Sequence, residues 1–222
     1  MHDDKTASPY EPALKHHFDD LGQQHEAAML GMWLFLGTEL LFFGGLFTAY
    51  MLYRVWYPGT FGAASRTLDI TLGAVNTMVL ITSSLTMALA VHAAATDERR
   101  KLMAFLAATM VLGAVFLGIK GIEYHHKFVE HHIPGFGFQF EGPAPERANL
   151  FFSLYFAMTG LHALHMIIGL GIMTVMLIMA WRGRFSARWH TPIEISGLYW
   201  HFVDIVWIFL FPLLYLIDRH VH

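Results

Sequence analysis

The last apolar stretch of the chain carries two ionisable side chains that could do chemistry inside a membrane. His201 and Asp204 are three residues apart, so they lie on nearly the same face of a helix. An ionisable residue at the centre of a membrane helix costs about 2.5–3.5 kcal/mol on insertion scales, so it normally faces protein and has a function. The pair is therefore a candidate polar site between helices.

Two other apolar stretches place ionisable groups at a similar depth. Glu39 lies roughly 18 Å into the first stretch at about 1.5 Å per residue, with no partner on its own helix. His162 and His165 are three apart in the fourth stretch. Depth counting predicts a buried network that links Glu39, His165 and Asp204, with Glu39 and His165 as the closest pair. Both a neutral, hydrogen-bonded glutamic acid that joins two helices and a proton-linked or lipid-linked role are open.

Further polar residues lie towards the other end of the expected helices. We expect Asn76 to make a hydrogen bond between helices. Glu123 ends the third apolar stretch beside Lys120, and this i,i+3 pair could be a surface ion pair or a functional one. Small residues such as Gly113 and Gly169 should let helices or lipid tails approach closely.

Fifteen histidines raise the question of a metal or a haem. Four of them in or beside one long loop lack a fixed helical spacing, so we expect no metal site there: His125, His126, His131 and His132. A haem b needs two axial histidines on facing helices, and His165 and His201 could be imagined in that role. The aspartate beside His201 and the lack of a second ligand pair argue against it. With no phosphate loop or nucleophile–base set either, we expect no catalytic centre in this chain.

Five apolar stretches must position these groups. The sequence is 55% hydrophobic and only 14% charged, whereas a soluble domain carries about 25% charged residues. The stretches reach the ~20 residues needed to cross a bilayer, and they cover about 27–53, 69–94, 102–123, 149–181 and 193–217. The sequence thus predicts an all-α fold, an integral membrane bundle of five transmembrane helices. This domain, 27–222, follows a polar arm, 1–26.

The basic residues predict the orientation of the bundle. Clusters at 99–101 and 182–188 fall on the same side as the arm, which places the N-terminus in the cytoplasm and the C-terminus outside. The arm lacks the apolar core of a signal peptide. We therefore expect a multi-pass membrane protein. The long loop 124–148, which contains prolines and glycines, should cover the helix ends on the outer side.

At this level of detail the chain resembles a known family. The run 197–207 closely resembles the signature of subunit III of haem–copper oxidases. Four other stretches agree with that family in the same order, and they are Glu39–Phe43, Asn76–Thr77, Gly121–Tyr124 and Thr159–His165. The resemblance covers about residues 27–217.

The resemblance implies a non-redox subunit of the five-helix form, in a bacterial-type inner membrane. Such a subunit docks on catalytic subunit I of a proton-pumping terminal oxidase, beside subunit II, other subunits and a respiratory supercomplex, with no nucleic-acid partner. Haem and copper would lie in the partner subunits, and this chain would bind phospholipid and sustain proton uptake. Glu39 would be the carbodiimide-reactive glutamate. The resemblance places the other residues in the same lipid- or proton-linked network: Asn76, Glu123, His162, His165, His201 and Asp204.

Three alternatives remain open at the sequence level. Subunit III of quinol oxidases is also similar, notably at Tyr124-His125-His126, although an aspartate often replaces the membrane glutamate there. Glu39 together with Asn76 therefore favours the cytochrome c branch. A haem-b anchor of a dehydrogenase would belong to a different class. A small proton-coupled transporter is disfavoured because the sequence shows no internal repeat.

Overall fold

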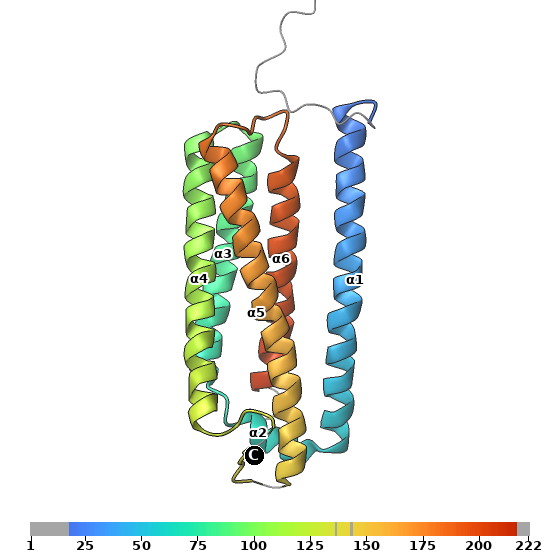
Figure 1. The fold of residues 1–222 in the computed structure, drawn as a ribbon, viewed down its shortest axis with the longest axis vertical. Helices are drawn as coiled ribbons and strands as arrows, with labels where there is room; N and C mark the ends of the chain where they lie inside the picture. Colours follow the sequence, from blue (N-terminus) through green and yellow to red (C-terminus); the bar gives the residue numbers. More distant parts are fainter. Residues whose placement is uncertain (1–17, 136, 143, 217–222) are drawn as a thin grey trace, which may run out of the picture.

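The computed structural model describes residues 18–135, 137–142 and 144–216, and within them the fold is a bundle of long helices (Figure 1). Five helices among the described residues are long and apolar enough to cross a membrane, which confirms the expected five-helix bundle. The helices are α1 (Leu21–Trp56), α2 (Pro58–Ser65), α3 (Ile70–Ala95), α4 (Arg99–Val129), α5 (Pro145–Trp181) and α6 (Thr191–Phe211), which continues as the π-helical turn η1 (Pro212–Leu216).

Helix boundaries differ from the predicted spans where polar residues extend a helix. The Asp20 side chain accepts a hydrogen bond from the backbone N–H of Gln23 at 2.7 Å, so α1 begins at Leu21. The predicted polar arm therefore loses its last six residues to the helix, while its residues 1–17 lie outside the described part. In the same way α4 continues to Val129 and shortens the loop that was expected from residue 124.

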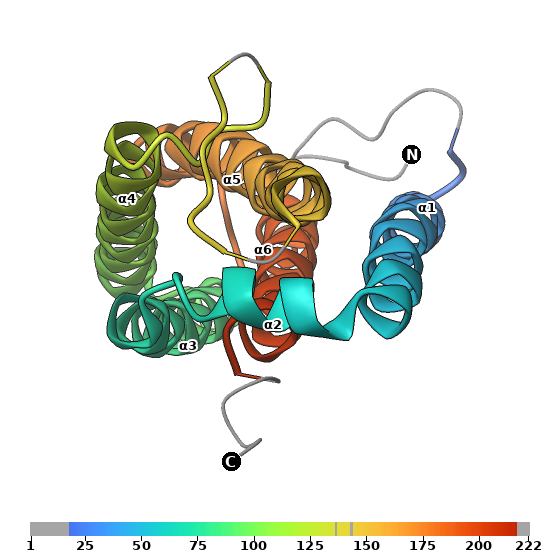
Figure 2. The same cartoon turned by 90° about the horizontal axis from the view of Figure 1, so that it is seen from below.

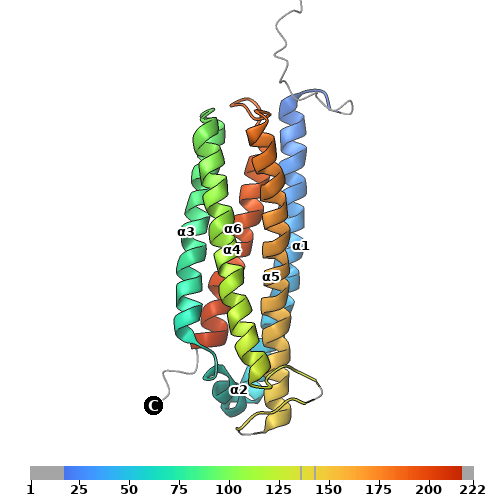
Figure 3. The same ribbon diagram turned by 60° about the vertical axis from the view of Figure 1, so that its left-hand side comes forward.

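The short helix α2 was not predicted. It crosses one end of the bundle between α1 and α3 (Figure 2), beginning with Pro58 at the first helical position, where a missing N–H does no harm. We call this end, which also holds the loop 130–144, the distal end. The end at which α1 begins is the proximal end (Figure 3).

Helix α6 organises the packing of the bundle. Figure 2 shows it between α3 and α1, with α5 on its other side. The ring of Trp200 is fully buried, and its Nε1 donates to the Ser83 hydroxyl at 3.0 Å. A Cβ added at Gly113 or Gly169 would lie 2.8 Å from this ring, so both glycines allow the close helix approach expected of them.

Candidate functional site

Glu39 and His165 meet between α1 and α5, as depth counting predicts. The Oε2 atom of Glu39 lies 3.2 Å from Nε2 of His165. On the other side of the ring, Nδ1 lies 2.8 Å from the carbonyl oxygen of Leu161. A carbonyl oxygen only accepts, so Nδ1 carries a hydrogen and donates it. An attractive contact between Nε2 and the carboxyl group then requires one proton between them.

Aromatic rings surround this pair on the bundle side. The ring of Phe43 lies 5.5 Å from the His165 ring, and Tyr199 stacks on it at 6.4 Å between centroids. The Tyr199 hydroxyl also donates to the backbone carbonyl of His165 at 3.0 Å. The side chains of Glu39 and His165 remain 21% and 12% exposed, so the pair is reachable from the flank of the bundle.

Asp204 does not join this pair, and that part of the expected network is wrong. Neither of its carboxyl oxygens has a hydrogen-bond partner among the described residues. Asp204 and His201 instead line a groove against α3, where Nδ1 of His201 lies 2.7 Å from the Ser84 hydroxyl. Depth alone does not fix the direction in which a helical side chain points, and Asp204 points to the α3 side of α6.

His162 is separated from His165 despite the shared face. It is buried with its ring 5.4 Å from Phe116 and 5.3 Å from Trp207. Neither ring nitrogen has a hydrogen-bond partner within the described ranges. Asn76, as expected, makes a hydrogen bond between helices, since its Nδ2 donates to the Phe116 carbonyl of α4 at 3.3 Å.

Lys120 and Glu123 form a buried ion pair, which excludes the surface pair, one of the two alternatives left open by the sequence. Their side chains are only 4% and 3% exposed, and Nζ lies 2.9 Å from Oε2. Two tyrosines close over the pair. Tyr155 donates to Oε1 of Glu123 at 2.8 Å, and Tyr215 donates to the same oxygen. The lysine also donates to both hydroxyl groups, at 3.2 Å and 3.0 Å respectively.

The distal end holds a second, more exposed cluster of charges, made by Lys127 in the last turn of α4 and by Glu130 and His132 after it. The amine of Lys127 lies 2.5 Å from Glu130 and donates to the Thr67 carbonyl at 2.8 Å. His132 lies 3.0 Å from the same carboxylate and stacks on the Phe152 ring at 4.8 Å. Burial and the Lys127 charge lower the pKa of His132. Burial opposes ionisation of Glu130, but Lys127 and His132 outweigh it and lower the pKa of that carboxyl.

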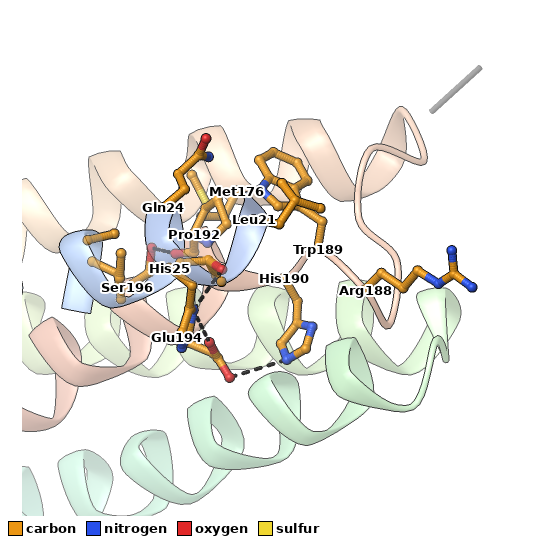
Figure 4. A pocket seen from close by; sticks show the side chains of 14 residues that line it. Leu21, Gln24, His25, Met176, Arg188, Trp189, His190, Pro192, Glu194 and Ser196 are labelled. Carbon is orange, nitrogen blue, oxygen red and sulfur yellow. Dashed lines mark hydrogen bonds and ion pairs between the residues drawn. The ribbon is translucent and has the colours of Figure 1, made fainter. Parts of the chain in front are cut away.

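A cleft of about 660 Å³ opens at the proximal end, where α1 meets the start of α6 (Figure 4). His25 reaches across it, with Nδ1 3.0 Å from the Thr191 hydroxyl and 3.6 Å from Glu194. His190 lies 3.2 Å from the other oxygen of the same carboxylate. Arg188 lies at the rim. The size of the cleft lies within the range of about 300–1,000 Å³ typical of small-molecule sites.

Comparison with known proteins assigns the chain to a family. A family model described as Cytochrome c oxidase subunit III matches residues 22–218. This range includes all the polar site residues named in the preceding paragraphs. The chain belongs to the cytochrome c oxidase subunit III family. It is thus a subunit of haem–copper oxidases, a multi-pass membrane protein that associates with other oxidase subunits.

Relatives in two kinds of oxidase support the family. "Cytochrome c oxidase subunit 3" of Thermostichus vulcanus is 34% identical over 209 residues, 90% of this chain and 92% of the relative. The protein of the same name from Alkalihalophilus pseudofirmus is 34% identical, covering 84% and 85%. "Cytochrome bo(3) ubiquinol oxidase subunit 3" of Pseudomonas aeruginosa is 32% identical, covering 89% and 91%.

The alternative of a haem b in this subunit III does not fit the geometry. Two axial ligands must direct a ring nitrogen to a shared iron. Nε2 of His165 faces Glu39 between α1 and α5, whereas His201 faces Ser84 on α3. The two imidazoles therefore serve different neighbours on different sides of α6.

Sequence reasoning missed the hydroxyl groups that complete these sites. Ser84 is the partner of His201, and Tyr155 and Tyr215 enclose the buried ion pair. A run of hydroxyl residues in the second apolar stretch was a usable signal for Ser84, because each must find a partner in the membrane. The tyrosines gave no such signal, since they also suit membrane edges.

Proposed function

We propose that this chain is the non-redox subunit III of a proton-pumping cytochrome c oxidase in a bacterial-type inner membrane, with its N-terminus in the cytoplasm. It docks on the catalytic subunit, which with subunit II carries the haem and copper, and it sustains proton uptake during electron transfer to O₂. The observation that carries the proposal is the pair Glu39 and His165, which lie 3.2 Å apart between two helices that are long and apolar enough to cross a membrane.

The pair is suited to hold and pass a proton. Because Nδ1 of His165 is committed to the Leu161 carbonyl, one proton is held between Nε2 and the Glu39 carboxyl. The proton can rest on either atom without changing the net charge of the pair, which avoids a net charge in hydrocarbon. The exposed edge of Glu39 gives this proton access to groups outside the chain.

The proximal cleft is the proposed phospholipid site. Its walls come from α1, α5 and α6, so acyl chains would separate α1 from the other helices. Arg188 at the rim supplies a cation for a phosphate group, and Trp189 beside it suits the headgroup region. Replacing Arg188 with glutamine should lower the phospholipid retained by the purified complex, whereas Arg182→Gln, outside the cleft, should not.

Turnover of the assembled oxidase tests the support role. Oxidase purified without this chain should keep its haem spectrum, but its activity at high pH should decay faster during turnover. Glu39→Gln should reproduce part of this decay, because an amide cannot release the shared proton. Glu141→Gln, at an exposed loop carboxylate, is the matched control. Loss of the haems without the chain would show that the proposed division of roles is wrong.

Labelling with a hydrophobic carbodiimide tests the pair itself. Such a reagent reacts with a protonated carboxyl group in the membrane. His165→Leu removes the base that shares the proton, so the labelling of Glu39 should rise. Labelling that is the same in the two proteins would mean that His165 does not share a proton with Glu39.

A quinol oxidase is the second candidate, supported by the relative from Pseudomonas aeruginosa. The presence of Glu39 and Asn76 favours cytochrome c as the donor. The purified complex separates the two candidates directly, because it will reduce O₂ with either reduced cytochrome c or a quinol as electron donor.

A further inference from the structure

The proximal half of α1 contributes no buried side chain to the bundle. The buried residues of α1 are Leu36, Phe43 and Tyr50, whereas every residue from 21 to 35 is exposed or half-buried. Tyr50 also donates to the Leu213 carbonyl oxygen at 3.0 Å, so the distal half of α1 is fixed by packing and by hydrogen bonding. Segments with few buried apolar contacts open at a low cost in free energy. The proximal half of α1 can therefore move more easily than the distal half.

Polar side chains join this half of α1 to the start of α6 across the proximal cleft (Figure 4). Nδ1 of His25 lies 3.0 Å from the Thr191 hydroxyl and 3.6 Å from Oε2 of Glu194. Nε2 of His190 lies 3.2 Å from Oε1 of the same carboxylate. One carboxylate of α6 thus lies between two imidazole rings, of which one belongs to α1 and the other to the residue before α6.

The strength of the contact across the cleft depends on the charge of His25. Imidazole ordinarily changes its charge between pH 5 and pH 8. A neutral ring can exchange a hydrogen bond with the Thr191 hydroxyl, but it has no charge to attract Glu194. A protonated ring donates to the same hydroxyl and adds an ion pair with the carboxylate at 3.6 Å. The side chains of His25 and Glu194 are 42% and 29% exposed, so protons from solution reach them.

The other side chains of the cleft wall do not reverse this dependence. Arg188 keeps its positive charge throughout this pH range, and Figure 4 shows its guanidinium group pointing away from Glu194. His190 is on the same side of the cleft as Glu194 and holds the carboxylate from its other oxygen. The wall residue from α5, Met176, does not titrate. The remaining wall residues from α1 carry no charge, and they are Leu21, Gly22, Gln24 and Ala28.

We propose that His25 and Glu194 form a pH-sensitive latch, which holds the proximal half of α1 against α6 at low pH and releases it as His25 loses its proton. His190 positions the carboxylate. Protons favour the closed cleft because they strengthen a contact that exists only there. An exposed ion pair shifts such an equilibrium by up to about fivefold. The consequence that an open latch lets phospholipid leave the cleft rests on the proposed function, whereas the latch itself does not.

A distance measurement across the cleft tests the latch. The chain contains no cysteine, so spin labels can be attached selectively through Ala27→Cys on α1 and Ala187→Cys before α6, at two exposed positions. In the full-length chain in lipid nanodiscs, the ratio of long to short distances should rise about fivefold from pH 5.5 to pH 8. The midpoint should lie near the usual histidine value of about 6.5. A distance distribution that is the same at both pH values would overturn the proposal.

Two controls show whether the movement is local and depends on the latch. Labels at the distal end, on Val55→Cys of α1 and Glu146→Cys of α5, should keep the same distance at both pH values. His92→Gln, at an exposed histidine in the last turn of α3, should leave the response across the cleft unchanged. A distal distance that changes as much as the proximal one would refute a latch confined to the cleft.

Substitutions in the latch separate the ion pair from a merely structural role. Glu194→Gln keeps a hydrogen-bonding group without a charge, so the opening between pH 5.5 and pH 8 should be lost. His25→Leu should show the long distance at both pH values. A native pH response in Glu194→Gln would refute the role of the carboxylate. Phospholipid release that does not follow the opening of the cleft would count against the proposed phospholipid site instead.

Discussion

The buried ion pair of Lys120 and Glu123 gives the sharpest test of how this fold is stabilised. Both residues are nearly inaccessible, at 3% and 2% exposed, and their charged groups are 2.9 Å apart. Each charge is completed by the other and by the hydroxyl groups of Tyr155 and Tyr215. Lys120→Met removes the cation and leaves a carboxylate with two tyrosine donors. Glu123→Gln removes the anion and leaves an ammonium group without a counter-charge.

The magnitude follows from the charge that remains. Removing one partner of a buried pair typically destabilises a protein by about 3–5 kcal/mol, because the other charge stays buried and uncompensated. The two tyrosines solvate the remaining charge, so we expect each single variant near the lower end, at about 3 kcal/mol. The double variant leaves no buried charge, and the glutamine oxygen still accepts from the tyrosines. It should therefore be more stable than either single variant.

Unfolding of the purified chain in mixed micelles by added denaturing detergent measures these differences. Lys101→Met is the matched control, since Lys101 makes an i,i+3 contact at 2.7 Å with Glu98 but its side chain is 63% exposed. Exposed pairs contribute at most about 1 kcal/mol. A Lys120→Met variant no less stable than Lys101→Met would refute the claim that the pair stabilises the bundle. A double variant less stable than both singles would refute the reasoning about the remaining charge.

Two further predictions concern packing and pH. Gly169→Ala should destabilise the bundle by roughly 1–3 kcal/mol in the same unfolding assay, because the added Cβ would lie 2.8 Å from the Trp200 ring. Gly171→Ala is the control and should have little effect, since a Cβ at that position would meet no atom within 4 Å. In the distal loop, the lowered pKa values of His132 and Glu130 mean that the unfolded loop binds protons more readily than the folded one. The stability that His132 contributes is therefore complete above its usual pKa of 6.5 and falls as the pH drops below that value. Hydrogen exchange of the loop amides, corrected for the intrinsic rate, should be faster at pH 5.5 than at neutral pH. An unchanged corrected rate would contradict this role of His132.

The number and order of the membrane helices could be predicted because one physical quantity determines them. A segment must be apolar over about 20 residues to cross hydrocarbon, and hydropathy measures that directly. The same quantity places helix ends poorly, because a helix continues past the hydrocarbon until its hydrogen bonding is interrupted. The start of α1 after the Asp20 cap and the continuation of α4 to Val129 are therefore determined by hydrogen bonding, which hydropathy does not measure.

The candidate site could be predicted only in part, for a geometric reason. Counting residues gives the depth of a side chain but not its direction around the helix axis. Glu39 and His165 share a depth and also point towards each other, so the predicted contact is present. Asp204 was predicted at a similar depth, but its side chain points to α3. The burial of Lys120 depends on Tyr215, which lies 95 residues further along the chain. A contact between residues so far apart in the sequence cannot be predicted from the residues around Lys120.

The completeness of hydrogen bonding separates the roles of the polar groups in the membrane. Lys120 and Glu123 have all their charges paired within the chain, so they contribute to stability and need no partner. Glu39 and His165 are paired with each other, but one proton between them can move and one edge is exposed, so they suit proton transfer. Asp204 is the member whose carboxyl oxygens lack any bond among the described residues. Burying a carboxyl group without a hydrogen bond is costly, so Asp204 contributes less to the stability of the bundle than Lys120 and Glu123 do.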